Sequence, residues 1–530
     1  MKKRAAVVLG ILVFVFGVIG VRIGYITTDV KQAAVPQSAM TIDIETLRGT
    51  IYDCNLQPLT NGETSVYVAA KPSGYALGQI KGKVLPEVFE SVLERMSTGK
   101  PVAVKVDSSV VSSKDIKEIK VPERYDSSSL ACHVIGYLNG EGHGVSGIEK
   151  SFDSLLLRGT STVSVRFSSN AKGRVMLGEE IVVTGNGMPK SGVVLTIDKN
   201  IQAITEKALD DSGADCAAAV VIEIESGAIR ACVSRPIFDQ NNIAQSLDDE
   251  KSPLINRAFL PFTVGSVFKP VVAAAALENG IDKNFEYNCT GSVTYNGVTF
   301  NCHKKEGHGI LDMSGAVAQS CNTYFIALAL ETGADNVLKT AEKFGFGKET
   351  VFSNGIKAAA GYLPELNELD SKASVANISF GQGLLLATPV QICAVMAAIA
   401  RGGVYTEPYL IEGETDENGD FVQIRSYGER KQIISVESAD LLKGFLERVI
   451  KEGSGSRASS DFVSAAGKTA TAQTGKTENG EEIYNAWFAG YFPADNPRFA
   501  VAILKENGGE GAVSCAPVFK EIAENCRQYY

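Results

Sequence analysis

The strongest hydrophobic pattern in the chain is an unbroken apolar run, Ala5–Val21, with basic residues at positions 2–4 before it and Arg22 after it. A helix over this run would be about 25 Å long, just enough to span a membrane, and the basic cluster predicts a cytoplasmic N-terminus. A cleaved signal peptide is the alternative, but the small-residue pair Ser38-Ala39 lies far beyond the run. We therefore expect residues 1–26 to be a cytoplasmic stub and an uncleaved transmembrane anchor, with almost all of the chain outside the cytoplasm.

Short β-branched runs separated by turns dominate the next part of the chain, residues 27–190. Ser65–Ala70 and Val102–Val106 are typical of strands, and the stretch from Pro86 to Met96 is typical of a helix. Few groups capable of catalysis occur in this region. A cluster of Gly, Asn, Pro and Ser at residues 185–192 indicates a domain boundary. The pattern predicts a mainly β, irregular domain.

Residues 191–530 mix strand and helix patterns. Asp198 is placed to cap a helix, and two apolar runs around Glu225-Ser226-Gly227 predict a hairpin. Near the C-terminus, Ala486–Phe492 and Arg498–Lys505 have strand patterns, and a terminal helix closes the chain. These elements predict an α+β domain in which helices flank one antiparallel sheet.

Charge and composition exclude some classes of partner. The chain has 51 Lys and Arg against 61 Asp and Glu, a net charge of −10. This balance argues against binding to nucleic acid and against a basic patch for a membrane surface.

Ten cysteines occur in the sequence, and two of them suggest a pairing. Cys289 and Cys302 flank a hairpin-like stretch, Gly291–Phe300, and are the best candidates for a disulfide bridge. His303 and His308 lie close by, so a zinc site is conceivable. Because the spacing fits no strong zinc template, we expect no metal, and we expect most other cysteines to be buried small hydrophobes.

The first stretch with candidate chemistry is a turn that leads into a helix of small apolar residues. It carries Ser266 at the start of the helix and Lys269 three residues later, so both side chains fall on one face. A buried lysine with a lowered pKa can take the proton that makes a serine hydroxyl nucleophilic. The alternative is an ordinary serine cap. The same spacing recurs at Ser169 and Lys172, where the polar surroundings suggest a solvated loop.

Two further stretches offer polar groups. Ser320 and Asn322 are separated by one residue between two helical patterns, so a hydroxyl and an amide could face one point, although either residue could simply cap a helix. Lys468, Thr469 and Thr471 lie on a strand of small side chains, along which a substrate backbone could pair as an added strand. The alternative there is a Thr-rich edge strand with a solvated lysine.

Taken together, Ser266-Val-Phe-Lys269, Ser320-Cys-Asn322 and Lys468-Thr-Ala470 resemble, in this order, the three motifs of the penicillin-binding, serine β-lactamase-like transpeptidases. Arg48–Asp53 and Gly147–Asp153 resemble segments of the pedestal domain of class B penicillin-binding proteins. The resemblance implies a β-lactamase/transpeptidase-like fold at residues 191–530, preceded by an elongated pedestal or dimerisation domain at residues 27–190 and one transmembrane helix.

The family resemblance implies a D,D-transpeptidase that cross-links peptidoglycan stem peptides. Ser266 would attack the penultimate D-alanine carbonyl of a D-Ala-D-Ala terminus, with Lys269 as the base. Ser320 and Asn322 would assist proton transfer and positioning. An amine of a neighbouring stem peptide would then accept the acyl group.

The same resemblance assigns the remaining site residues and the partners. Lys468, Thr469 and Thr471 would bind the terminal carboxylate, and the backbone N–H groups of Ser266 and Thr471 would form the oxyanion hole. β-Lactam antibiotics would acylate Ser266, and no cofactor or metal would be required. A polytopic membrane glycan polymerase would be the partner protein.

Two positions depart from the family pattern, and two other functions stay open. Ala470 stands where the third motif has glycine, and Cys54 stands where the first pedestal segment has arginine. With water as acceptor the protein would be a D,D-carboxypeptidase or a β-lactamase, although the anchor and pedestal argue against a secreted β-lactamase. With no turnover it would be a β-lactam-binding sensor or scaffold.

Overall fold

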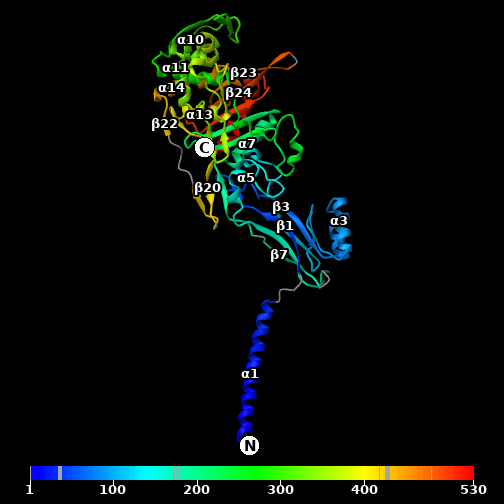
Figure 1. The fold of residues 1–530 in the computed structure, drawn as a ribbon. Coiled ribbons are helices and arrows are strands. Elements are labelled where there is room, and N and C mark those ends of the chain that lie inside the picture. The colour runs from blue at the N-terminus through cyan, green and yellow to red at the C-terminus, as the bar shows by residue number, and fades with distance from the viewer. Residues whose placement is uncertain are drawn as a thin grey trace. The chain divides into compact units, whose positions relative to one another are not determined.

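The structure is a computed structural model that describes residues 2–33, 39–170, 174–176, 178–185, 187–416, 418–423, 430–478 and 480–530. The chain forms two compact units (Figure 1). The smaller unit comprises residues 1–47, 64–123 and 161–188, and the larger unit comprises residues 48–63, 124–160 and 189–530.

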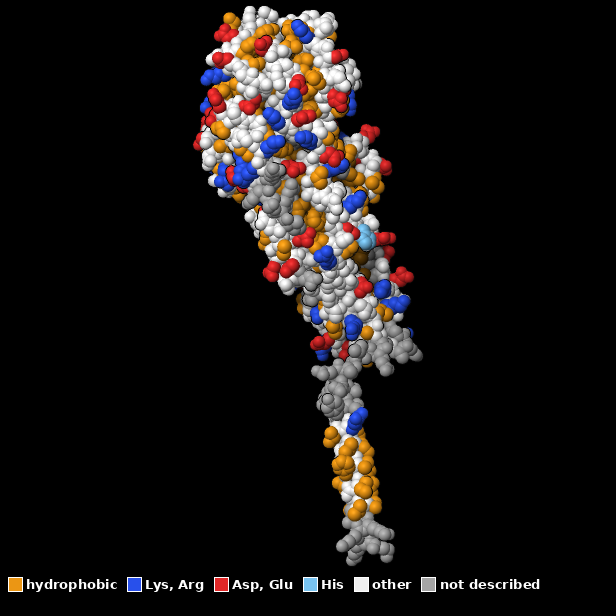
Figure 2. Space-filling view, turned by 60° about the vertical axis from the view of Figure 1, so that its left-hand side comes forward, with side chains coloured by type: hydrophobic (Ala, Val, Ile, Leu, Met, Phe, Trp, Pro, Cys, Tyr) orange, Lys and Arg blue, Asp and Glu red, His pale blue; other side chains and the backbone are white. Residues whose placement is uncertain are grey.

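Helix α1 (Lys2–Ala33) begins the smaller unit. Its segment Val7–Gly24 is long and apolar enough to cross a membrane, and none of it is buried against the rest of the protein. Figure 2 shows hydrophobic side chains along the described surface of this helix. The helix is longer than the expected span because no proline interrupts residues 22–33. An exposed apolar surface of this length fits a single membrane-spanning helix.

Among its described residues, the rest of the smaller unit consists of two antiparallel three-stranded sheets and two helices, as expected for a mainly β region. The sheets have the strand orders β4-β3-β5 and β1-β6-β7. Helix α3 has a proline at its start, as the sequence predicted. The elements are β1 (Ala39–Leu47), β3 (Thr64–Ala70), α2 (Gly74–Ile80), α3 (Pro86–Ser97), β4 (Val102–Val106), β5 (Ile116–Pro122), β6 (Ser161–Ser168) and β7 (Val182–Thr184).

One antiparallel five-stranded sheet organises the larger unit, in the order β10-β9-β25-β24-β23. This confirms the predicted α+β fold. Both the hairpin around Gly227 and the two strand patterns near the C-terminus belong to this sheet. The strands are β9 (Ala217–Glu223), β10 (Ile229–Arg235), β23 (Ala466–Glu478), β24 (Glu481–Phe492) and β25 (Phe499–Lys505).

Helices cover both faces of this sheet, and the alternation of side chains along β9 shows it. Val220 and Ile222 belong to the core that the sheet shares with the central helices. Ala219 and Val221 point to the other face, toward α7 and α16. Asp198 caps α7 by accepting hydrogen bonds from two backbone N–H groups, as predicted. The helices are α7 (Lys199–Asp211), α8 (Lys269–Glu278), α9 (Met313–Ala318), α10 (Asn322–Thr332), α11 (Ala334–Lys343), α12 (Lys372–Ser379), α13 (Pro389–Ala400), α14 (Val436–Glu452), α15 (Gly511–Ser514) and α16 (Ala516–Cys526).

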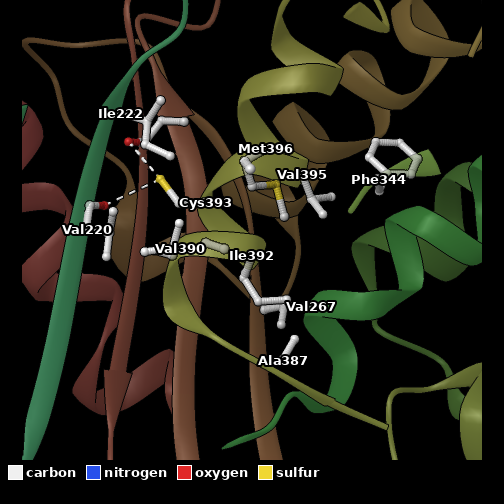
Figure 3. Packing of buried hydrophobic residues seen from close by; sticks show 14 of the residues in the cluster. Val220, Ile222, Val267, Phe344, Ala387, Val390, Ile392, Cys393, Val395 and Met396 are labelled. Atoms are coloured by element: carbon white, nitrogen blue, oxygen red, sulfur yellow. Dashed lines mark hydrogen bonds between the residues drawn. The ribbon is translucent and has the colours of Figure 1, made fainter. Parts of the chain in front are cut away.

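Helix α13 is packed directly on the sheet (Figure 3). The thiol of Cys393 donates to the backbone carbonyls of Val220, at 3.5 Å, and Ala500, at 3.2 Å. Cys393 is fully buried, which confirms for this residue the expectation of a cysteine used as a small core side chain. The helix therefore gives the sheet a rigid backing.

Smaller elements complete the larger unit. A second sheet has the order β2-β8-β20-β21, and five pairs of short strands form separate ribbons. These elements are β2 (Thr50–Tyr52), α4 (Cys132–Ile135), α5 (Gly147–Ser151), α6 (Asp153–Leu156), β8 (Gly192–Leu195), β11 (Phe262–Thr263), β12 (Tyr287–Cys289), β13 (Ser292–Tyr295), β14 (Val298–Asn301), β15 (Gly309–Leu311), β16 (Thr350–Ser353), β17 (Ile356–Ala358), β18 (Leu386–Ala387), β19 (Val404–Thr406), β20 (Ile411–Thr415), β21 (Phe421–Gln423) and β22 (Arg430–Gln432).

The two compact units do not follow the single boundary expected at residue 190. Residues 48–63 and 124–160 group with the larger unit. Ion pairs around the buried Glu149 join these two segments to each other. Arg48 contacts Glu149 at 2.9 Å and Asp153 at 2.7 Å, and Arg124 contacts Glu149 at 2.7 Å. Ion pairs between residues 25 to 105 positions apart cannot be anticipated from local patterns. The division into an anchor, a pedestal and a transpeptidase domain stays a prediction.

Candidate active site

Ser266 lies in a short 3-10 turn, Gly265–Phe268, and Lys269 is the first residue of α8. Ser266 is partly exposed, whereas Lys269 is completely buried. Gly265 begins the turn with φ of +60°, and its N–H donates to the carbonyl of Gly381 at 2.8 Å. The turn therefore leaves the serine accessible while it draws the lysine into the interior.

The amino group of Lys269 is held by the loop that precedes α10. Its Nζ donates to Asn322 Oδ1 at 2.7 Å, to the Ser320 carbonyl at 2.7 Å and to Ser320 Oγ at 3.3 Å. Burial lowers the pKa of Lys269 to about 8. A substantial fraction of this lysine is therefore neutral near physiological pH and able to accept a proton.

Ser320 adopts a left-handed backbone conformation, with φ of +54°. This conformation is uncommon for a residue other than glycine and costs on the order of 1 kcal/mol or more. It turns the chain between α9 and α10 so that both the carbonyl and the hydroxyl of Ser320 face Lys269. The strain occurs where the side chain meets two ammonium groups.

The second ammonium group belongs to Lys468 on strand β23. Its Nζ donates to Ser320 Oγ at 2.8 Å and to the Thr469 carbonyl at 3.0 Å. Lys468 is completely buried, and this burial, together with the charge of Lys269, holds its pKa well below the usual value. Two buried lysines thus share one hydroxyl, an arrangement that disfavours a positive charge on both.

Strand β23 is the last strand in the order of its sheet among the described residues, so one of its edges carries no neighbouring strand. Thr469 is buried and donates from Oγ1 to Ser454 Oγ at 3.1 Å, whereas Thr471 is exposed and accepts at Oγ1 from the Gly511 N–H at 3.3 Å. An open strand edge offers backbone groups to which an extended peptide can pair.

Comparison with known proteins agrees with this geometry. The model of the penicillin binding protein transpeptidase domain matches residues 217–524. Stage V sporulation protein D of Bacillus subtilis is 30% identical to this chain, over 96% of the chain and 82% of that protein. The peptidoglycan D,D-transpeptidase FtsI of Escherichia coli is 27% identical, over 77% of the chain and 68% of FtsI.

Solved structures with the same fold include penicillin binding protein 3 of Mycobacterium tuberculosis complexed with aztreonam. It has 25% identity and a TM-score of 0.67, and the match covers 92% of this chain and 97% of that one. The chain belongs to the class B penicillin-binding proteins. A structure described as a peptidoglycan synthase complex matches with a TM-score of 0.69 at 22% identity, over 99% of this chain and 98% of that one, which shows the fold alone.

Within this penicillin-binding protein, the three predicted motifs come from three separate segments and meet at one point. Lys269 follows the first turn, Ser320 and Asn322 precede and begin α10, and Lys468 lies on β23, yet both lysines reach Ser320 Oγ. In the second Ser-x-x-Lys pair, Ser169 is buried in the smaller unit, so the expectation of a solvated loop is wrong for this residue, and Lys172 lies outside the described residues.

The two departures from the family pattern are accommodated locally. Ala470 is 3% exposed, and a Cβ added to Gly265 would lie 3.4 Å from the Ala470 methyl. The extra methyl therefore packs beside the glycine that begins the Ser266 turn, on the opposite face of β23 from Thr469 and Thr471. Cys54 lies beside Asp198 in the larger unit, with its Sγ 4.0 Å from Asp198 Oδ2.

Some residues that shape the site were not predicted from the sequence. Gly381, with φ of +76°, contacts the Gly265 carbonyl so closely that an added Cβ would lie 2.1 Å from it. Ser454 Oγ accepts a hydrogen bond from Thr469 Oγ1. Cys321, next to Ser320 in the same loop, contacts the sulfur of Cys302. No local pattern in the sequence shows which turn Gly381 contacts.

The expected bridge between Cys289 and Cys302 is not formed, since all ten cysteines are free. Both sulfur atoms instead lie 3.5 Å from His308 Nδ1, and Cys302 Sγ also lies 3.8 Å from Cys321 Sγ. Among the described residues, these four side chains are the one group placed to hold a metal ion.

Proposed function

We propose that this protein is a serine D,D-transpeptidase that cross-links peptidoglycan stem peptides through an acyl-enzyme on Ser266. The observation that carries the proposal is the Ser320 hydroxyl shared by Lys269 and Lys468, which links three distant motifs beside an accessible serine. The relatives named as D,D-transpeptidases support the same reaction.

Acylation begins when Ser266 Oγ attacks the penultimate D-alanine carbonyl and gives its proton to neutral Lys269. The backbone N–H groups of Ser266 and Thr471 hold the oxyanion of the tetrahedral intermediate. When the C–N bond breaks, the departing D-alanine nitrogen takes a proton through Ser320 from the lysine pair. The ester on Ser266 then remains.

The second half of the reaction transfers the acyl group from Ser266 to an amine, with the proton transfers in the opposite direction. An amine of a second stem peptide attacks the ester carbonyl, loses its proton to the site, and Ser266 Oγ is released with its proton restored. Lys468, Thr469 and Thr471 bind the carboxylate of the donor peptide, which lies along the open edge of β23 as an added strand. The N–H groups of Lys468 and the hydroxyls of the two threonines are the hydrogen-bond donors for this carboxylate.

We expect α1 to be a single-pass anchor with its basic N-terminus in the cytoplasm and the larger unit outside it. A polytopic membrane glycan polymerase is the expected partner. A solved structure described as a peptidoglycan synthase complex has the same fold as this chain, and this shared fold is the support for such a partner.

The test is intact-mass analysis of the full-length protein in detergent after incubation with a penicillin, beside Ser266→Ala and Ser169→Ala. We expect one covalent adduct on the wild type and on Ser169→Ala and none on Ser266→Ala. An adduct on Ser266→Ala would assign the nucleophile to another residue and refute the proposal.

Product analysis with a stem-peptide donor then distinguishes the acceptors. A cross-linked product that requires an added acceptor amine supports the transpeptidase. Release of D-alanine at the same rate without the amine would make the protein a carboxypeptidase. A stable adduct with no turnover of any donor would make it a β-lactam-binding scaffold.

A further inference from the structure

Four side chains converge on one another, three from the hairpin-rich segment 287–311 and one from the loop that carries Ser320. Cys289 ends β12, Cys302 directly follows β14, His308 directly precedes β15, and Cys321 is the residue before α10. One ligand atom from each of the four lies within 4.8 Å of all the others. The three cysteines are buried and His308 is half-buried.

Three distances within this cluster match the edges of a tetrahedron around zinc. His308 Nδ1 lies 3.5 Å from both Cys289 Sγ and Cys302 Sγ, and Cys302 Sγ lies 3.8 Å from Cys321 Sγ. Zinc–ligand bonds of about 2.3 Å to sulfur and about 2.0 Å to nitrogen give a sulfur–sulfur edge of about 3.8 Å and a nitrogen–sulfur edge of about 3.5 Å. A disulfide would instead require sulfur atoms about 2 Å apart.

The backbone is folded tightly to bring these ligands together. Gly291 and Gly307 have φ of +96° and +83°, and an added Cβ would lie 2.0 Å from the Lys305 carbonyl and 2.2 Å from the Cys289 carbonyl, respectively. The Cys302 N–H donates to the Gly291 carbonyl at 2.8 Å. Only glycine fits at both positions, so the loop is built to return His308 to the two cysteines.

Hydrogen bonding does not explain why a histidine occupies this place. The second ring nitrogen of His308, Nε2, is buried and has no hydrogen-bond partner among the described residues. Its other nitrogen faces two sulfur atoms, which are weak hydrogen-bond partners. An imidazole nitrogen directed at thiols is instead a normal arrangement for a metal ligand.

We propose that Cys289, Cys302, His308 and Cys321 bind one Zn²⁺ ion. Binding releases three protons, one from each thiol, and leaves a site with a net charge of −1. Three soft thiolates and one imidazole in a tetrahedral arrangement select zinc over the harder divalent cations. Because four protein ligands fill the coordination sphere, the ion is structural and takes no part in the chemistry at Ser266.

The ion would position the catalytic loop, a role that rests on the function proposed above. Cys321 lies between Ser320 and Asn322, the two residues that hold Lys269. Asn322 Nδ2 also donates at 3.1 Å to the carbonyl of Asn301, the neighbour of Cys302. Zinc would therefore fasten residues 287–311 to the loop at Cys321, next to the hydrogen bond of Asn322, and stabilise the strained backbone of Ser320.

The metal itself is tested on full-length protein purified in detergent without added chelator. Elemental analysis should find about one zinc ion per chain in the wild type and at least about tenfold less in Cys289→Ala and His308→Ala. Cys526→Ala is the matched control, because Cys526 is also buried but lies in α16, outside the cluster. It should keep its zinc.

A second variant separates the loss of a ligand from the loss of the fold. His308→Cys retains four ligands of the kind that zinc binds, so it should keep about one zinc ion per chain. Wild-type protein that contains no zinc and takes up none from solution would overturn the proposal. So would a disulfide between Cys302 and Cys321 in the isolated protein, or equal zinc contents in the wild type and Cys289→Ala.

The positioning role has its own readout. Removal of zinc with a chelator should slow acylation of Ser266 by a penicillin at least about tenfold, and added zinc should restore the rate. An unchanged rate in zinc-free protein would refute the positioning role, while the zinc content would still establish the site. Because zinc content is measured without any substrate, this result is independent of the transpeptidase proposal.

Discussion

Acylation of Ser266 should depend steeply on pH, because its base is a buried lysine whose pKa is lowered to about 8. The neutral form of Lys269 is the reactive one, so the rate rises with pH and levels off above pH 8. About 1% of Lys269 is neutral at pH 6 and about 90% at pH 9, which gives a rate increase of about 90-fold over this range. An unperturbed lysine would still be rising tenfold per pH unit at pH 9.

The assay is single-turnover acylation of the full-length protein with an excess of a fluorescent penicillin, measured between pH 6 and pH 9. Circular dichroism at each pH establishes that the protein stays folded. Lys505→Met is the matched control, since Lys505 is a buried lysine of the same sheet whose pKa is also lowered by burial but which lies outside the site. It should leave the midpoint of the profile unchanged.

Two results would refute this reasoning about the base. A rate that is flat between pH 6 and pH 9 would mean that Lys269 does not accept the proton in the step that limits acylation. A rate that falls as the pH rises would mean that the protonated lysine is the active form.

Three further changes have expected outcomes. Gly381→Ala should lower the free energy of unfolding by roughly 1–3 kcal/mol more than Gly402→Ala, measured by denaturant unfolding, because both have positive φ but only Gly381 faces a close carbonyl. Equal losses would remove the close contact as the cause. Glu149→Gln should cost about 3–5 kcal/mol in the same assay, since it removes the buried carboxylate that pairs with buried Arg48 and partly buried Arg124, and a loss below 1 kcal/mol would contradict this. Lys468→Met should slow penicillin acylation about 100-fold or more, as it removes a proton donor to Ser320, and an unaltered rate would exclude that role.

The sequence predicted elements well where one local pattern was enough. The hairpin around Gly227, the cap at Asp198 and the terminal helix at Ala516–Cys526 are all confirmed, because turn residues, caps and periodicity are local signals. The prediction that small side chains would line β23 is likewise consistent with the strand seen there.

Features that depend on contacts between distant segments could not be predicted. Nothing near Ser320 in the sequence indicates that two lysines, 51 and 148 positions away, share its hydroxyl. The sequence argues against a zinc site because Cys289, Cys302 and His308 fit no spacing template. It also does not show that Cys321, which lies inside a motif with another assignment, is the fourth side chain of the cluster. Ligand sets assembled by folding are visible only in three dimensions.

The chain passes between its two compact units several times, at residues 47–48, 63–64, 123–124, 160–161 and 188–189. A protease that cuts one of these connections would release neither unit, since the other connections remain covalent. Gene fusion or recombination faces the same limit: no single crossover point exchanges one unit and leaves the other whole. The two units of this protein are therefore expected to be inherited together, unlike domains joined end to end by one linker.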